Sequence, residues 1–235
     1  RMNKKAANNT AVRYLRYLKN VMQYAIANKW ATEDPFLGKR FKRTVADREA
    51  LTEAELKRMM NLDLKAYPRV EAVRDTFVFC CFTGLAFCDI KSLKRSDITT
   101  DAEGNMWIRK HREKTGELSV IPLLDVPRRL IEKYSNHPKV MLEGVVLPVI
   151  SNQRMNAYLK EVADLAKINR HLTSHIGRHT FATLSLSNHV PIESISKMLG
   201  HSDIRTTQIY AKMQAKTIYE DMASMRQKFD CVMMN

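Results

Sequence analysis

The stretch HIGRHTFAT, residues 175–183, sets two histidines and an arginine at the spacing of one helical face. His175, Arg178 and His179 stand at positions i, i+3 and i+4, so their side chains can meet on one side of a helix. Histidines four residues apart can bind zinc, and the same face can hold a phosphate with cationic donors. A histidine pair that only packs, beside a solvated arginine, is the third possibility.

The zinc interpretation lacks a general base. A hydrolytic zinc helix carries a glutamate directly after its first histidine, where this chain has Ile176. Arg178 would also place a permanent positive charge beside the metal. We therefore expect no metal and no cofactor. The phosphate interpretation suits the residues better, because an arginine offers a fixed fork of donors and a histidine can donate or transfer a proton near neutral pH.

Composition indicates a polyanionic partner. Of 235 residues, 39 are Lys or Arg and 25 are Asp or Glu, and the formal net charge of +14 is spread along the chain. Such an excess is typical of nucleic-acid binding, although charge alone does not separate DNA from RNA or an anionic membrane. The chain opens with Arg1, so we expect that it is part of a longer protein.

The opening residues and the cysteines lead us to expect a cytoplasmic protein. RMNKKAANNT is not expected to be a secretory signal, because no apolar stretch follows its charges, and no apolar run approaches the length that spans a membrane. The four cysteines form no CxxC pair, which favours reduced thiols in a reducing compartment. They are Cys80, Cys81, Cys88 and Cys231.

Periodicity divides the chain into three segments. Residues 9–29 predict an amphipathic helix that Pro35 terminates, and since one helix cannot bury its own face, we assign residues 1–36 to the end of a helical domain. Residues 37–50 lose the period and predict a basic linker. Thr52 and Glu55 have the spacing of a capping box, so a second domain, residues 51–235, begins there.

The second domain is predicted to be mainly α with a small antiparallel β-sheet. A helix over residues 69–82 ends at Thr83-Gly84, and a short helix follows around residues 86–93. Residues 106–114 and 117–124 flank Thr115-Gly116 and predict a hairpin, with a third strand upstream in residues 98–105. From residue 126 onward the pattern is helical, and one helix begins near Pro191 and ends at Gly200.

The histidine–arginine motif does not stand alone. TGLAFCDI begins at residue 83, REKTG occupies residues 112–116, LGH occupies residues 199–201, and Tyr210 follows. This order of motifs resembles the tyrosine recombinase (phage-type integrase) family, and is most similar to integrases of mobile genetic elements. The resemblance covers about residues 51–215, the catalytic domain, and residues 1–36 resemble the C-terminal part of the family's helical core-binding domain, which binds DNA.

The resemblance implies a site-specific DNA recombinase. Such an enzyme cleaves and rejoins DNA strands through a 3′-phosphotyrosine intermediate, without metal or ATP, and integrates or excises a mobile element. Its partners would be double-stranded DNA and further copies of the chain, in a tetrameric synapse on DNA in the bacterial cytoplasm. Two alternatives stay open: a type IB topoisomerase-like nicking–closing enzyme, and a DNA-binding regulator with impaired catalysis.

The resemblance also implies roles for individual residues. Tyr210 matches the nucleophile. Lys114, on the hairpin, matches the lysine that protonates the leaving 5′-oxygen. The groups that match the stabilisers of the developing phosphate charge are Arg178, His175 and His201. We expect Asp89 to orient a neighbouring cation and His179 to support Arg178.

One position departs from the family pattern. The first box usually reads TGLR, and this chain has Ala86 in place of the arginine. Losing one donor to a developing oxyanion costs about 3–4 kcal/mol. Arg74 is a poor substitute, because twelve residues of helix span about 18 Å. Arg112 is two residues from Lys114 and would share its strand face, so we hypothesise that Arg112 supplies the missing charge. A simple DNA-backbone contact and a solvated arginine are the alternatives.

The rest of the surface offers further candidate contacts. Arg43, Arg154 and Arg205 are candidate DNA contacts, although most basic residues only add to the overall field. Near the C-terminus one helical stripe is predicted, and it could pack on its own domain or on a neighbouring protomer. Its members are Ile218, Met222, Met225 and Phe229.

Overall fold

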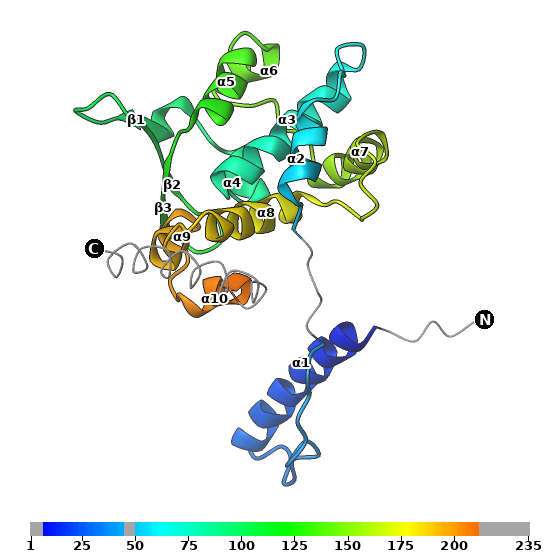
Figure 1. Ribbon diagram of the computed structural model, residues 1–235. Coiled ribbons are helices and arrows are strands. Elements are labelled where there is room, and N and C mark those ends of the chain that lie inside the picture. The colour runs from blue at the N-terminus through cyan, green and yellow to red at the C-terminus, as the bar shows by residue number, and fades with distance from the viewer. Residues whose placement is uncertain (1–6, 45–49, 212–235) are drawn as a thin grey trace, which may run out of the picture. The chain divides into compact units, whose positions relative to one another are not determined.

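The computed structural model describes residues 7–44 and 50–211, and the chain forms two compact units, Arg1–Asp47 and Arg48–Asn235 (Figure 1). In the first unit, α1 (Asn8–Ala27) is followed by a turn over residues 35–38. The chain then returns to the start of α1, where Thr44 N donates to Asn9 Oδ1 at 2.9 Å and Asn9 Nδ2 donates to Thr44 O at 2.8 Å. The helix predicted for residues 9–29 is therefore confirmed, with its end two residues earlier.

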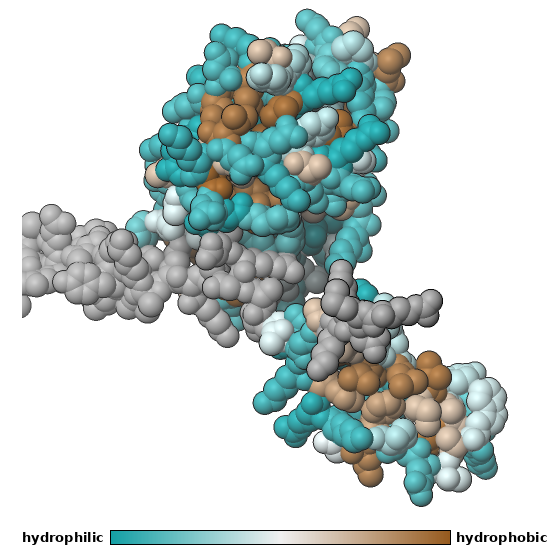
Figure 2. Space-filling view, turned by 90° about the vertical axis from the view of Figure 1, so that its right-hand side faces the viewer, coloured by the Kyte–Doolittle hydropathy of each residue, from teal (hydrophilic) through white to brown (hydrophobic). Residues whose placement is uncertain are grey.

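Helix α1 leaves most of its apolar surface exposed. Within α1 only Val12 is buried, and Leu18 and Val21 are at least half exposed. Apolar side chains gather on the surface of this unit in Figure 2. The periodicity of α1 predicts an apolar stripe, and a single amphipathic helix has no second surface on which to bury it.

The second unit begins with two helices whose ends are set locally. Helix α2 (Glu53–Met60) starts at the predicted capping box: Glu55 N donates to Thr52 Oγ1 at 3.2 Å, and Thr52 N donates to the Glu55 carboxylate at 2.8 Å. Helix α3 (Pro68–Thr83) has Pro68 in its first turn and ends at Gly84, whose φ of +66° is the left-handed conformation that favours glycine. The predicted start of α2 and the predicted end of α3 are confirmed.

A three-stranded antiparallel sheet interrupts the helices, with strand order β1-β2-β3. The strands are β1 (Ile98–Thr100), β2 (Met106–His111) and β3 (Leu118–Pro122). Ile108 of β2 pairs with Ile98 and Ile121 of its neighbours, and Ile108 and Ile121 are fully buried. The predicted fold class, mainly α with a small antiparallel sheet, is confirmed.

The hairpin strands are shorter than the sequence predicted. Strand β2 ends at His111, and Gly116 N donates to Arg112 O at 2.8 Å, which closes a turn over the intervening residues. Arg112 and Lys114 therefore lie in this turn and do not alternate along a strand. The expectation that strand geometry aligns these two side chains is wrong.

Helix α3 packs against α2, α5, α7 and α8, and residues 50–211 contain eight further helical segments. They are α4 (Phe87–Lys91), η1 (Arg95–Asp97), α5 (Asp125–Lys133), α6 (Pro138–Glu143), α7 (Asn152–Leu165), α8 (Ser174–Ser187), α9 (Ile192–Met198) and α10 (Arg205–Ala211). One apolar cluster joins α2, α3 and α7, a second joins α3 to the sheet, and a third joins α8, α9 and α10. The third cluster includes Phe181, Leu199 and Tyr210.

No helix within residues 7–44 and 50–211 is long and apolar enough to cross a membrane. The stripe predicted from Ile218 to Phe229, and Cys231, lie outside the described residues. The other three cysteines are free thiols.

Candidate active site

The sequence motifs meet around the guanidinium of Arg178, on α8. Arg178 is 3% exposed, its Nη1 donates to Gly84 O at 2.7 Å, and its Nη2 donates to Leu199 O. The carbonyl of Gly84 ends α3, and that of Leu199 follows α9, so one side chain joins three segments far apart in the sequence. Because a guanidinium cannot lose its proton in proteins under ordinary conditions, this buried group is a fixed positive charge.

Close backbone approach makes this junction possible, and three glycines provide it. A Cβ on Gly84 would lie 2.4 Å from Phe181 Cδ1, and one on Gly177 would lie 2.6 Å from Cys80 Cβ. Gly200 has φ +59°, and a Cβ there would lie 2.6 Å from Arg112 Cδ. The glycines in TGL, HIGRH and LGH therefore let α3, α8 and the hairpin turn pack against one another.

His201 contacts Arg178 and the helix that carries Tyr210. Its Nε2 lies 2.9 Å from Arg178 Nη2, and its Nδ1 lies 2.8 Å from Thr207 Oγ1 on α10. Burial, followed by the charges of Arg178 and Arg112, lowers the pKa of His201 from 6.5 to about 4. His201 is therefore neutral at pH 7 in this state.

Arg112 reaches the same site from the hairpin turn. Its Nη1 donates to Gly200 O at 3.0 Å, and its Nε lies 3.8 Å from Asp89 Oδ2. The pKa of Arg178 is lowered from 12.5 to about 10, mainly by burial and next by the positive charge of Arg112. Two arginines thus lie within electrostatic range of each other, and Arg178 stays protonated at neutral pH.

Asp89, on α4, is the carboxylate of this site. It is 1% exposed, and its Oδ1 accepts from Glu113 N at 2.9 Å, which ties the hairpin turn to α4. Its Oδ2 and Arg112 Nε are buried without a hydrogen bond, although they face each other. Asp89 therefore lies where it can orient Arg112.

Tyr210 is buried in the described structure. It is 4% exposed within the third apolar cluster, and its ring centroid lies 5.2 Å from that of His179. His179 is itself buried, and its ring contacts the exposed His175 at 4.5 Å. Tyr210 also influences the pKa of Arg178, so the two lie within electrostatic range.

The remaining predicted residues lie at the edge or outside this cluster. Lys114 is exposed in the hairpin turn, and Ala86 precedes α4 without a side chain that could replace an arginine. Arg43, Arg154 and Arg205 are exposed, the first beyond α1, the others on α7 and α10.

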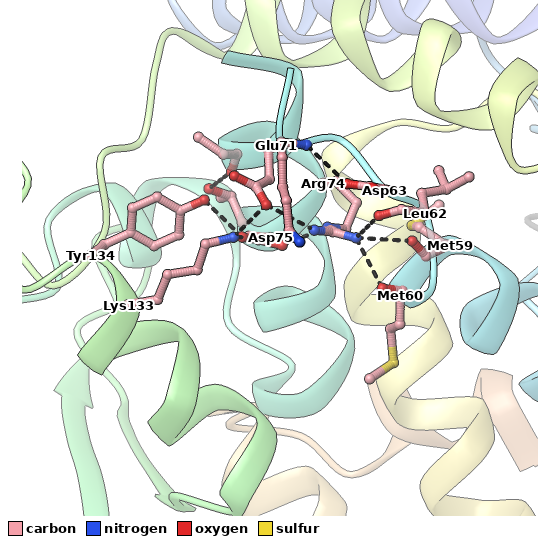
Figure 3. A network of polar contacts seen from close by, with 12 residues as sticks. Met59, Met60, Leu62, Asp63, Glu71, Arg74, Asp75, Lys133 and Tyr134 are labelled. Atoms are coloured by element: carbon pink, nitrogen blue, oxygen red, sulfur yellow. Dashed lines mark hydrogen bonds and ion pairs between the residues drawn. The ribbon is translucent and has the colours of Figure 1, made fainter. Parts of the chain in front are cut away.

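Arg74 lies apart from the site, in agreement with its rejection as a substitute. Its Nη1 donates to Met60 O at 2.9 Å, its Nε contacts Asp75, and it is 7% exposed (Figure 3). These partners hold the end of α2 against α3. A guanidinium held by these carbonyls and by Asp75 would have to give up these partners to approach Arg178.

Sequence reasoning missed one polar residue of the site, Thr207. It is fully buried, and it bonds to His201 six residues earlier in the chain. The available signal was its place one turn before Tyr210, because residues three apart share a helix face. The carbonyls of Gly84 and Leu199 were also missed, since backbone groups carry no residue signature.

The sequence matches one family of known proteins. A family profile described as "Phage integrase family" matches residues 49–217. The tyrosine recombinase XerA of Saccharolobus solfataricus is 34% identical over 132 residues, which cover 56% of this chain and 42% of the relative. The chain therefore spans less than half of the length of that relative.

Two solved structures are similar in fold. The Tn1549 transposon integrase in complex with circular intermediate DNA has a TM-score of 0.66 at 18% identity, and the match covers 88% of this chain and 76% of that one. A lambda integrase tetramer bound to a Holliday junction has a TM-score of 0.65 at 19% identity, over 82% of this chain and 56% of that one.

Proposed function

The chain belongs to the phage integrase family, and on this premise we propose that it is a site-specific DNA recombinase. It would cleave and rejoin DNA strands through a 3′-phosphotyrosine intermediate, and so integrate or excise a mobile element. The observation that carries the proposal is an excess of buried positive charge beside the helix of Tyr210. Arg178 and Arg112 share a site with one carboxylate, Asp89, and with the neutral His201.

This charge balance suits a phosphodiester. A five-coordinate phosphorus bears more negative charge than the ester it forms from, and preplaced donors stabilise that charge most effectively in a buried site. Arg178 and Arg112 are such donors, and their bonds to backbone carbonyls hold them in place without neutralising them. A backbone phosphate would supply the missing negative charge.

The proposed reaction needs neither an oxidant nor an energy source. The Tyr210 oxygen bonds to phosphorus and releases its proton, while the bond from phosphorus to the 5′-oxygen breaks and that oxygen takes up a proton. One phosphoester replaces another, and attack by a second strand's 5′-hydroxyl reverses the step. Since Tyr210 is 4% exposed, α10 has to rearrange before its hydroxyl meets the phosphate.

Arg112 takes the place of the arginine that is absent at Ala86. Its Nη1 bond to Gly200 O, its approach to Asp89 and its effect on the pKa of Arg178 support this role. If Arg112 replaces the missing group, Arg112→Ala cleaves DNA about 10²–10³-fold more slowly, and Ala86→Arg restores part of the rate in that background. Normal cleavage by Arg112→Ala would sink the assignment.

The other roles follow from position. Lys114, in the turn next to Arg112, donates the proton to the leaving 5′-oxygen; a mobile exposed lysine can reach into a groove. The exposed His175 contacts phosphate, and the buried His179 supports Arg178, its neighbour in the chain; the His179 ring also contacts His175 and Tyr210. Asp89 orients Arg112 and transfers no proton.

Partners follow from the relatives and from the charge. Tn1549 integrase was solved with DNA and lambda integrase as a tetramer on a Holliday junction. For this chain we propose double-stranded DNA, self-association into a tetramer on it, and residence in the bacterial cytoplasm. Its net charge of +14 supports the first of these. Arg43, Arg154 and Arg205 would add phosphate contacts.

The decisive experiment detects a covalent adduct. The protein is incubated with nicked suicide duplexes made from the DNA that flanks its gene, and denaturing gels separate any protein–DNA adduct. Wild type should form the adduct and Tyr210→Phe should not. No adduct from wild type would refute the recombinase and favour a DNA-binding regulator.

A second assay separates strand transfer from nicking and closing. Two differently labelled duplexes that carry the selected site are mixed, and joined products are compared with relaxation of a supercoiled plasmid. A recombinase joins the two labels, whereas a topoisomerase IB-like enzyme only relaxes the plasmid. The recombinase and integrase names of the relatives favour the first result.

A further inference from the structure

The hydrogen bond between His201 and Thr207 has a direction that the geometry determines. Arg178 Nη2 lies 2.9 Å from His201 Nε2, and guanidinium nitrogens only donate, so Nε2 is the acceptor. The proton of the neutral ring then sits on Nδ1, which donates to Thr207 Oγ1 at 2.8 Å. In this structure, His201 therefore has no proton on the nitrogen that faces Arg178.

That tautomer is the wrong one for contact with a phosphate. A phosphate oxygen only accepts hydrogen bonds, and Nε2 without a proton would repel it. His201 can gain a proton on Nε2 by becoming an imidazolium or by moving its single proton from Nδ1. The charges that face the ring, Arg178 from α8 and Arg112 from the hairpin turn, are both positive and oppose the imidazolium.

A hydroxyl can serve both tautomers, because it accepts through its lone pairs and donates through its proton. We propose that Thr207 is a positioning residue that lets His201 switch tautomer: it accepts from Nδ1–H in the free protein, and donates to Nδ1 when Nε2–H turns to a phosphate oxygen. This inference rests on the proposed function. Proton balance is kept, since the ring carries one proton before and after.

The position of Thr207 couples this switch to the nucleophile. Thr207 and Tyr210 are three residues apart on α10, both are buried, and they share one face of that helix. A shift of α10 that exposes Tyr210 therefore moves the hydroxyl that holds His201. The same motion that delivers the nucleophile releases the ring from its free-state partner.

The chain offers a matched set of variants. Thr207→Val keeps the shape of the fully buried side chain and removes the hydroxyl, whereas Thr207→Ser keeps the hydroxyl. Thr206→Val makes the same change at the adjacent, exposed position. Cleavage of the suicide duplex should slow about 10- to 100-fold in Thr207→Val, as is typical for loss of a residue that orients a functional histidine, while the other two stay within about threefold of wild type.

The tautomer is read independently of activity. In protein labelled with ¹⁵N at histidine, NMR correlations between ring nitrogens and carbon-bound protons distinguish Nδ1–H from Nε2–H, and a His201→Asn spectrum assigns the signal. We expect Nδ1–H in the DNA-free protein. The Tyr210→Phe protein lacks the nucleophile and therefore leaves the selected duplex intact. In its complex with that duplex we expect His201 to carry its proton on Nε2.

Several outcomes would overturn the inference. They are a His201 ring that keeps Nδ1–H on DNA, a Thr207→Val protein that cleaves at the wild-type rate, and a Thr207→Ser protein as slow as Thr207→Val. If Thr207→Val does not fold, the serine variant and the NMR measurement still decide. A wild-type protein that forms no adduct refutes the recombinase instead, and the DNA-free spectrum then tests the free-state half of the inference alone.

Discussion

Two buried arginines in the second unit bind backbone carbonyls, yet their surroundings differ in charge. Arg74 donates to carbonyls at the end of α2, and Glu71 and Asp75 accompany it together with Lys133 (Figure 3). Two positive and two negative groups balance there. Arg178 also donates to carbonyls, but within residues 7–44 and 50–211 its charged neighbours are Arg112 and one carboxylate, Asp89.

The charge balance around each arginine distinguishes a structural cluster from an anion-binding site. The Arg74 cluster is complete: Lys133 Nζ and Tyr134 Oη both donate to Asp75 at 2.7 Å, and burial together with this carboxylate raises the pKa of Tyr134. Nothing in its balance calls for a ligand. At Arg178 the positive charge exceeds the negative, and a buried excess of this kind is expected where an anion binds.

The strongest contrast should come from removing each arginine. Arg178→Ala should reduce the rate of covalent cleavage by at least about 10²–10³-fold, because a preplaced donor to the transition state is lost. Arg74→Ala should instead lower the free energy of unfolding by about 1–3 kcal/mol, because the carbonyls at the end of α2 lose their donor, while Lys133 and Tyr134 still pair with the acids. Urea titration and adduct formation below the unfolding transition measure the two effects.

Loss of cleavage in a folded Arg74→Ala protein would contradict the assignment of a structural role to Arg74. A folded Arg74→Ala protein that lost cleavage as completely as Arg178→Ala would mean that the Arg74 cluster takes part in the reaction. Arg58→Ala is the control, because Arg58 also donates to a carbonyl, Ala166 O at 3.1 Å, and should leave cleavage unchanged.

A methyl group at the helix junction should sharpen the same contrast through packing. Gly177→Ala places a Cβ 2.6 Å from Cys80 Cβ, and neither α3 nor α8 can move without displacing Arg178. Overpacking of this kind costs about 1–3 kcal/mol of stability. Thermal unfolding should show the loss, and cleavage by the folded protein should fall as well. Gly116→Ala, with open space around its Cβ position but φ +72°, controls for backbone strain alone.

The pH dependence of stability should carry a signature of His201. Its pKa is about 4 in the folded protein and 6.5 when unperturbed, so between these values the unfolded chain binds a proton that the folded chain does not. Stability should therefore be full above pH 6.5 and fall as the pH drops towards 4. His201→Asn should remove this part of the slope when unfolding midpoints are compared across that window. Parallel profiles for the two proteins would contradict the lowered pKa.

The smallest effect is expected at the surface. The Arg205 side chain is 84% exposed, and its ion pair with Asp203 at 3.8 Å contributes little to stability. Arg205→Ala should leave unfolding unchanged and reduce the salt dependence of DNA binding by about one phosphate contact. Binding titrations at several salt concentrations measure the slope. An unaltered slope would remove Arg205 from the DNA contacts.

Local sequence predicted the elements well because local hydrogen bonds and periodicity set them. The capping box at Thr52, the glycine that ends α3 and the hairpin around Thr115-Gly116 each depend on residues within a few positions of one another. The strand ends were misjudged because the chain turns after Arg112, where Gly116 N donates to Arg112 O, and β-branched or apolar content does not reveal where a turn begins.

The site divides along the same line. The residues that could carry phosphate chemistry are already identified by HIGRH, LGH and Tyr210, whose types and spacing exist before any folding. Only the tertiary structure decided that Arg112 approaches Arg178, that Tyr210 is buried and that Thr207 holds His201. The physical reason is distance along the chain: these contacts join segments whose approach depends on packing at Gly84, Gly177 and Gly200, and no local pattern encodes how closely two helices meet.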